Sequence, residues 1–93
     1  MSVQTDVKSA TLTADGTAYA GRTRVKSLVL TATATAGSVV LRDGGASGTV
    51  RITLNTPAAA DFHNILLPGE GVLFTSDVYV DVTNVSSVTV FHG

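Results

Sequence analysis

The chain of 93 residues has no cysteine and no tryptophan, and its aromatic residues are limited to two tyrosines and three phenylalanines. Without cysteine it can form neither a disulfide framework nor a thiolate metal site, so its stability has to come from its core or from partners. Charged residues make up 14% of the chain, against roughly 25% in an average soluble protein. The net charge of −1 argues against a protein that coats nucleic acid, because phosphate neutralisation needs a surplus of Lys and Arg.

Long apolar runs are missing as well. The longest stretch without a charged residue is Ser27–Leu41, whose fifteen residues are interrupted by threonines and a glycine and fall short of a bilayer span. Residues 1–6 lack the basic start and apolar run of a secretory signal. We therefore expect neither a membrane span nor export by a signal peptide, and a chain of this length has room for one domain.

Valine and threonine are abundant, with fourteen of each, whereas Glu and Gln occur once each. This composition favours strands and disfavours long helices. Apolar residues at alternate positions indicate half-buried strands within 49–55, 78–83 and 88–91. The residues expected to face the core in these strands are Val50, Ile52, Leu54, Val78, Val80, Val82, Val88 and Val90.

Turn signals separate the strands at the short spacing that is typical of a sandwich or a small barrel. Asp43-Gly44-Gly45 and Pro68-Gly69 each combine residues that favour a tight turn, and we expect a hairpin at both places. The strands expected to be joined in this way are 39–42 with 49–55, and 62–67 with 72–74.

The segment 24–35 carries apolar residues on both parities beyond Leu28. Either a bulge near Ser27 switches the inward face, or this strand is central and meets a second surface. As a whole, the pattern predicts an all-β protein, with one antiparallel β-sandwich domain over residues 1–93 that is jelly-roll-like or a small barrel of about seven to eight strands. Residues 1–8 are a candidate extended N-terminal arm.

His63 and His92, with Asp61, Asp77 and Asp81, are the residues best suited to a metal or acid–base site, because imidazole and carboxylate are the available ligands. Neither histidine has the HxH or HExxH spacing of a metal-binding motif, so structural roles are favoured. We predict no catalytic residue, no metal and no cofactor. An enzyme built on Asp61, His63 and His92 is the third and least favoured hypothesis.

Arg22, Arg24 and Lys26 alternate with uncharged residues, so an extended chain presents three positive groups on one side within about 14 Å. This basic stripe is our candidate for docking to an acidic partner. A structural alternative is that charges on an edge strand block unwanted pairing.

The scarcity of charge has a consequence for the surface. A sandwich of this size exposes most of its residues at least partly, and the few charged side chains cannot solvate all of it. Exposed apolar patches of more than a few hundred Å² usually mark interfaces. We therefore expect self-association as a dimer or trimer, attachment to a larger particle, or both.

Several strings of the chain resemble small virion proteins of tailed phages, especially marine short-tailed ones. The resemblance covers most of the chain, and the strings that carry it are Thr17–Arg24, Val39–Gly44, Leu67–Phe74 and Val88–Gly93. It implies a structural part of the particle, such as a capsid decoration (cement) protein that contacts the major capsid protein. A protein of this kind is made in the host cytoplasm and assembled there into the virion.

The expected function is thus that of a non-enzymatic virion protein that self-associates and stabilises a capsid shell, with residues 2–8 as a second docking element. The alternative is a carbohydrate- or receptor-binding module of a tail or fibre, which would use the loops around 44–48 and 77–81. Asp77, Tyr79 and Asp81 alternate there and could bind calcium or a sugar. The lack of tryptophan argues against this alternative.

Overall fold

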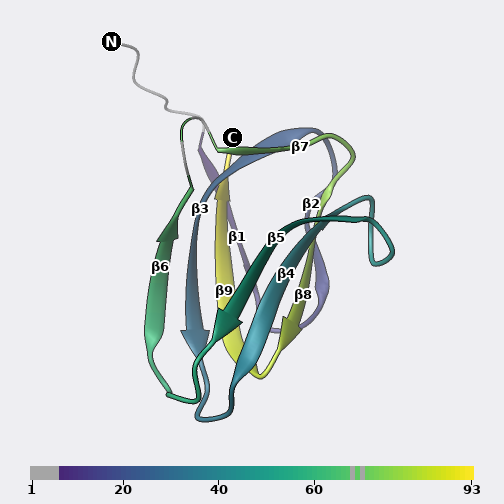
Figure 1. The fold of residues 1–93 in the computed structure, drawn as a ribbon. Helices are drawn as coiled ribbons and strands as arrows, with labels where there is room; N and C mark the ends of the chain where they lie inside the picture. Colours follow the sequence, from purple (N-terminus) through teal and green to yellow (C-terminus); the bar gives the residue numbers. More distant parts are fainter. Residues whose placement is uncertain (1–6, 68, 70) are drawn as a thin grey trace.

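The computed structural model describes residues 7–67, 69 and 71–93, which form nine β-strands in two sheets (Figure 1). The strands are β1 (Lys8–Leu12), β2 (Gly16–Tyr19), β3 (Thr23–Ala32), β4 (Gly37–Asp43), β5 (Thr49–Thr56), β6 (Phe62–Leu66), β7 (Val72–Phe74), β8 (Val78–Thr83) and β9 (Val85–His92). Among the described residues there is no helix of the length and apolar character needed to traverse a bilayer.

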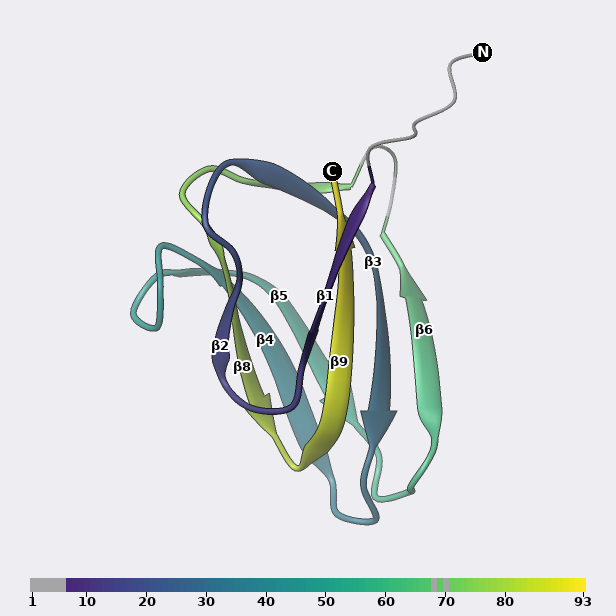
Figure 2. The same ribbon diagram turned by 180° about the vertical axis from the view of Figure 1, so that it is seen from behind.

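The two sheets pack face to face as a sandwich (Figures 1 and 2). Sheet A has the order β1-β9-β3-β6, with β7 also paired to β3, and sheet B has the order β2-β8-β4-β5. The antiparallel pairs β1:β9, β2:β8, β3:β6 and β4:β5 are those of one long hairpin rolled into two sheets, which is the jelly-roll arrangement. The predicted all-β sandwich is confirmed. The nine strands fill eight positions, because β6 and β7 pair with successive parts of β3.

The core lies between the sheets and is built from the inward parity of each central strand. The predicted inward residues of β8 and β9 are confirmed, since Val78, Val80, Val88 and Val90 are fully buried. The prediction for Val50 is wrong, because Arg51 is an extra residue in β5 opposite the step from Leu41 to Arg42, and this bulge turns the Val50 side chain outward, where it is 46% exposed. The fully buried core side chains are Phe74, Leu28, Leu30, Leu41, Val25, Val39, Val78, Val80, Val88 and Val90.

A bulge near Ser27 explains the apolar residues on both parities of β3. The pairing of β3 with β9 shifts register between Val25 and Ser27. Thr23 and Val25 face inward before the shift, and Leu28 and Leu30 face inward after it. The bulge predicted as one of two interpretations is therefore confirmed, and it lets a ten-residue strand keep one apolar face on the core. The strand is also central in sheet A, between β9 and β6, as the other interpretation required, and the second surface that it would meet stays a prediction.

The two predicted hairpins have different outcomes. The hairpin between β4 and β5 is confirmed, with the turn at residues 44–48. The hairpin between β6 and β7 is wrong, because both strands pair with β3 instead of with each other. Of the candidate arm, residues 1–6 lie outside the described residues, and Lys8 begins β1 opposite His92.

Candidate docking face

Part of the outer face of sheet A is an uncharged surface formed by three cross-strand rows. Two exposed apolar side chains stand on its edge strand β6: Phe62 is 69% exposed and Leu66 is 78% exposed. Half-buried Val29 and Phe91 extend the apolar surface across β3 and β9. Each row crosses β9, β3 and β6 in that order, and we call the three rows together the docking face. The rows are Phe91, Ser27 and Leu66; Thr89, Val29 and Asn64; and Ser87, Thr31 and Phe62.

The strands explain why these side chains point outward. In β6, His63 and Ile65 face the core, so the alternate residues Phe62, Asn64 and Leu66 face away from it. None of the nine docking-face residues is charged. An apolar and hydroxyl-rich sheet surface of this kind loses little when a partner covers it, because no ion has to be desolvated.

The predicted basic stripe lies at one end of this face. Thr23 and Val25 are buried, so Arg24 and Lys26 lie on the outer side of β3, at the end where it pairs with β7. Arg22 is exposed in the turn that precedes β3. Arg24 and Lys26 are therefore continuous with the docking face on sheet A, and Arg22 precedes them in the adjoining turn.

The outer face of sheet B differs in its charges. Arg42 and Asp81 face outward on β4 and β8, with 3.9 Å between Nε of Arg42 and Oδ2 of Asp81. Tyr79 lies opposite Arg42, and exposed Thr53 stands on the edge strand β5. This face holds a pair of opposite charges and polar side chains beside exposed Val50, so it is more polar than the docking face.

The loops beside sheet B are held together by two carboxylates. Asp43, with a side chain 3% exposed, accepts hydrogen bonds from the backbone N of Thr75 at 2.9 Å and of Ser76 at 2.8 Å. Thr75 Oγ1 at 3.0 Å, Arg51 Nη2 at 3.2 Å and Asp77 N at 3.5 Å also donate to this carboxylate. These hydrogen bonds, led by the one from the Thr75 backbone, hold the pKa of the Asp43 carboxyl far below its usual range.

Asp77 makes the reciprocal contact. Its Oδ1 accepts hydrogen bonds from Gly44 N at 2.8 Å and Gly45 N at 3.0 Å. The loop at 44–48 and the turn at 75–77 are thus held together by two carboxylate clasps: Asp43 binds the backbone of the turn, and Asp77 binds the backbone of the loop. The loops that the carbohydrate-binding alternative requires have their carboxylates engaged within the chain: Asp77 holds Gly44 and Gly45, and Asp81 faces Arg42.

The two histidines lie at different places in sheet A. His63 pairs with Leu30 and His92 with Val25, positions five residues apart on β3, or about 16 Å along the strand. Within the described part of the chain no three His, Cys, Asp or Glu side chains gather as a metal-binding group. The arrangement required by the enzyme hypothesis, with Asp61, His63 and His92 in one site, is therefore not formed by these positions.

His92 is a buried polar residue at the end of the core. It is 2% exposed, its Nδ1 lies 3.3 Å from Thr23 Oγ1, and its ring centroid lies 4.7 Å from that of Tyr19. Lys8 places its Nζ over the same tyrosine ring, 5.5 Å from the centroid. Burial and, to a smaller extent, the charge of Lys8 lower the pKa of His92 from its ordinary value of 6.5.

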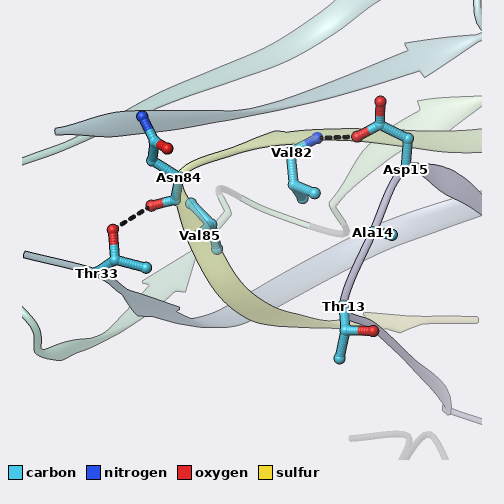
Figure 3. A pocket seen from close by; sticks show the side chains of 7 residues that line it. All are labelled: Thr13, Ala14, Asp15, Thr33, Val82, Asn84 and Val85. Carbon is cyan, nitrogen blue, oxygen red and sulfur yellow. Dashed lines mark hydrogen bonds between the residues drawn. The ribbon is translucent and has the colours of Figure 1, made fainter. Parts of the chain in front are cut away.

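A hollow of about 550 Å³ opens at the end of the sandwich where β8 turns into β9 (Figure 3). Its polar groups bind the loops to one another. Asp15 Oδ1 accepts a hydrogen bond from Val82 N at 2.8 Å, and Thr33 Oγ1 donates one to Asn84 O at 3.0 Å, as Figure 3 shows. Asn84 Nδ2 donates to Ala36 O at 3.1 Å. These contacts give the hollow a structural role.

A smaller cavity of about 190 Å³ lies between the sheets, beside β5 and β6. Leu30, Leu54 and Ile65 make most of it apolar, and His63 lines it with a buried Nε2 that has no hydrogen-bond partner among the described residues. Its other polar lining residues are Asn55 and Thr56, and Thr56 Oγ1 accepts a hydrogen bond from Gly37 N at 3.0 Å. This provides no set of convergent groups for catalysis.

The sequence analysis missed the apolar edge formed by Phe62 and Leu66. The signal was present, because residues 62–66 read apolar, polar, polar, apolar, apolar, so that both faces of a strand would carry apolar groups. Its significance depends on β6 lying at the edge of sheet A, which only the topology shows.

No protein-family model matches the chain, and no curated protein or solved structure gives a significant match. The resemblance to phage virion proteins stays a prediction.

Proposed function

We propose that the protein is a non-enzymatic virion structural protein, a capsid decoration protein that covers and stabilises a protein shell. The observation that carries this proposal is the docking face, where Phe62 and Leu66 are exposed at 69% and 78% on a surface without charge. Exposed apolar surface on a soluble protein commonly marks an interface, and a covering partner explains these two side chains.

The charges of sheet A indicate the kind of partner surface. Among its described strand residues the charged ones are Lys8, Arg24 and Lys26, all of them positive. A shell surface that fits this protein is apolar where it meets the docking face and acidic where it meets the basic stripe. Attachment stabilises the shell, because a ligand that binds only the assembled state shifts the equilibrium towards it.

Co-sedimentation with empty shells, assembled from the major capsid protein encoded in the same genome, tests the proposal. Thr31 and Thr53 form a matched pair, since both are exposed strand threonines, the first on the docking face and the second on the outer side of β5. We expect Thr31→Glu to weaken shell binding by about tenfold or more, which corresponds to 1.4 kcal/mol. Thr53→Glu should leave binding unchanged.

Arg24→Glu extends the test to the basic stripe. It should weaken attachment while the melting temperature stays close to that of the wild type, because Arg24 lies on the outer side of its strand. Equal binding by Thr31→Glu and Thr53→Glu would contradict a docking role for sheet A. Selective binding on a glycan array, with no binding to shells, would favour the carbohydrate-binding alternative.

A further inference from the structure

The four sheet edges of the sandwich differ in their protection against pairing with another chain. Edge strands are commonly protected by charge, bulges or shortness. Lys8 begins β1, β2 has four residues and a register shift between Thr17 and Tyr19, and β5 carries Arg51 beside the shift at Leu41. β7 has only three residues.

β6 has none of these devices. Its five residues, Phe62–Leu66, include no charge and no proline, and they pair with β3 without a register shift. Among the described residues no strand pairs with its other side, and both views show β6 at the margin of sheet A (Figures 1 and 2). The nearest charge along the chain is Asp61, whose Oδ1 accepts a hydrogen bond from Phe62 N at 2.8 Å.

We propose that β6 pairs antiparallel with β6 of a second copy of this chain, about a twofold axis at Asn64. This inference rests on the proposed function, since it names a second copy that lies beside the docking face and enlarges the surface offered to a shell. In this register Phe62 lies opposite Leu66 of the second copy, and Asn64 lies opposite Asn64. An amide group can donate to and accept from an identical amide, so the central pair is self-complementary.

The order of apolar and amide side chains on the outer side of β6 selects this register. A twofold axis at His63 would place Phe62 opposite Asn64, and an axis at Ile65 would place Leu66 opposite Asn64. Each of these slips sets an amide against an apolar side chain, so the axis at Asn64 matches both kinds of group. It also keeps the two copies of Asp61 at opposite ends of the pairing, about 20 Å apart along the strand, where they do not repel each other.

The pairing joins the two A sheets into one continuous sheet. The docking faces of both copies then lie on the same side, and the area offered to a shell is doubled. An isologous contact of this kind closes on itself, because the same strand serves both partners and each copy has one unprotected edge.

The absence of cysteine allows a direct test by cross-linking. Asn64→Cys introduces the only thiol, and directly opposed residues of an antiparallel pair have Cα atoms about 4.5–5.5 Å apart, within the range of a disulfide. Under mild oxidation at tens of micromolar we expect most of the chain to become a covalent dimer. The control Thr53→Cys, on the bulged edge strand β5, should cross-link only slowly, by collision.

Light scattering of the wild-type chain should give twice the monomer mass at the same concentration. Leu66→Lys places a charge on the edge and should raise the dimer dissociation constant by about 100-fold. Leu66 is exposed, so the variant keeps its fold, and the control Thr53→Lys keeps the dimer. A monomeric wild-type chain, or equal cross-linking at positions 64 and 53, would overturn the pairing.

The two proposals fail separately. A monomer that still co-sediments with shells overturns the β6 pairing and leaves the decoration function standing. A β6-paired dimer that binds no shell overturns the decoration function and leaves the pairing standing.

Discussion

Sheets A and B occupy equal numbers of positions in the sandwich, yet they differ in how their polar groups are used. Sheet B and its loops contain Asp15, Asp43, Asp77 and Asp81, and each of these carboxylates has a partner within the chain. The described strands of sheet A contain no carboxylate and expose Phe62 and Leu66. The carboxylates of sheet B and its loops are engaged within the chain, whereas sheet A leaves apolar side chains exposed on the surface that we propose a partner covers.

This difference separates stability from function in the molecule. Substitutions in the carboxylate clasps of sheet B should affect folding and leave association intact, because the clasps lie away from the docking face. Substitutions on the outer face of sheet A should affect association and leave folding intact, because those side chains are exposed in the monomer.

The largest effect on stability is expected for Asp43→Asn, which removes hydrogen bonds that hold the loops beside sheet B together. The two carboxylate oxygens of Asp43 accept from several donors at once, and an amide can offer only one oxygen to them. The melting temperature should fall by about 10 °C, with dimerisation through β6 unchanged in the folded fraction. Circular dichroism melts followed by light scattering at 20 °C measure both.

Asp77→Asn is the matched control for this prediction. A single oxygen of Asp77 accepts from both Gly44 N and Gly45 N, and an asparagine can keep that oxygen in place. The control should therefore melt within a few degrees of the wild type. If the two variants were equally destabilised, loss of negative charge would be the cause, and the argument from the number of acceptors would be refuted.

The second effect concerns the interior of sheet A and depends on pH. Burial lowers the pKa of His92, so below pH 6.5 the unfolded chain binds more protons at this residue than the folded chain. The contribution of neutral His92 to the free energy of unfolding is fully present at pH 7.5 and above. It is lost as the pH falls below 6.5, with a slope of at most about 1.4 kcal/mol per pH unit for one proton.

Urea denaturation between pH 7.5 and 5.5 checks this prediction. His92→Phe should flatten the decline of the unfolding free energy in that range, whatever its effect on stability at pH 7.5. Lys8→Gln should reduce the decline only in part, because the charge of Lys8 is the smaller of the two causes. An undiminished slope in His92→Phe would exclude His92 as the origin of the acid sensitivity.

The sequence predicted those features of the fold that are encoded locally. Alternation of valines located β8 and β9, and turn residues located the β4–β5 hairpin. The pairing of both β6 and β7 with β3 is decided by contacts between residues far apart in the chain, which a turn signal such as Pro68-Gly69 does not contain. A local rule therefore joined two strands that the fold keeps apart.

The candidate site shows the same limit. The basic stripe was visible because Arg22, Arg24 and Lys26 alternate, whereas the exposure of Leu66 follows from the position of β6 in sheet A. Asp43 read as a turn residue, and its contact with Ser76, 33 positions away, leaves no pattern in the sequence. Groups that act through long-range contacts were found only in the structure.

The smallest effect is expected for the ion pair on the outer face of sheet B. Arg42 Nε and Asp81 Oδ2 are 3.9 Å apart, beyond hydrogen-bond distance, and the Asp81 side chain is 37% exposed. Partly exposed pairs of this kind contribute about 0–1 kcal/mol, so Asp81→Asn should change the unfolding free energy by about 0.5 kcal/mol or less. A double-mutant cycle with Arg42→Gln, followed by urea denaturation, measures the coupling free energy between the two side chains.

A coupling well above 1 kcal/mol would mean that the outer face of sheet B also stabilises the fold. The difference between the two sheets would then consist only of the exposed apolar side chains of sheet A. With a weak coupling, the hydrogen bonds of Asp43 and Asp77 account for the polar interactions of sheet B that stabilise the fold.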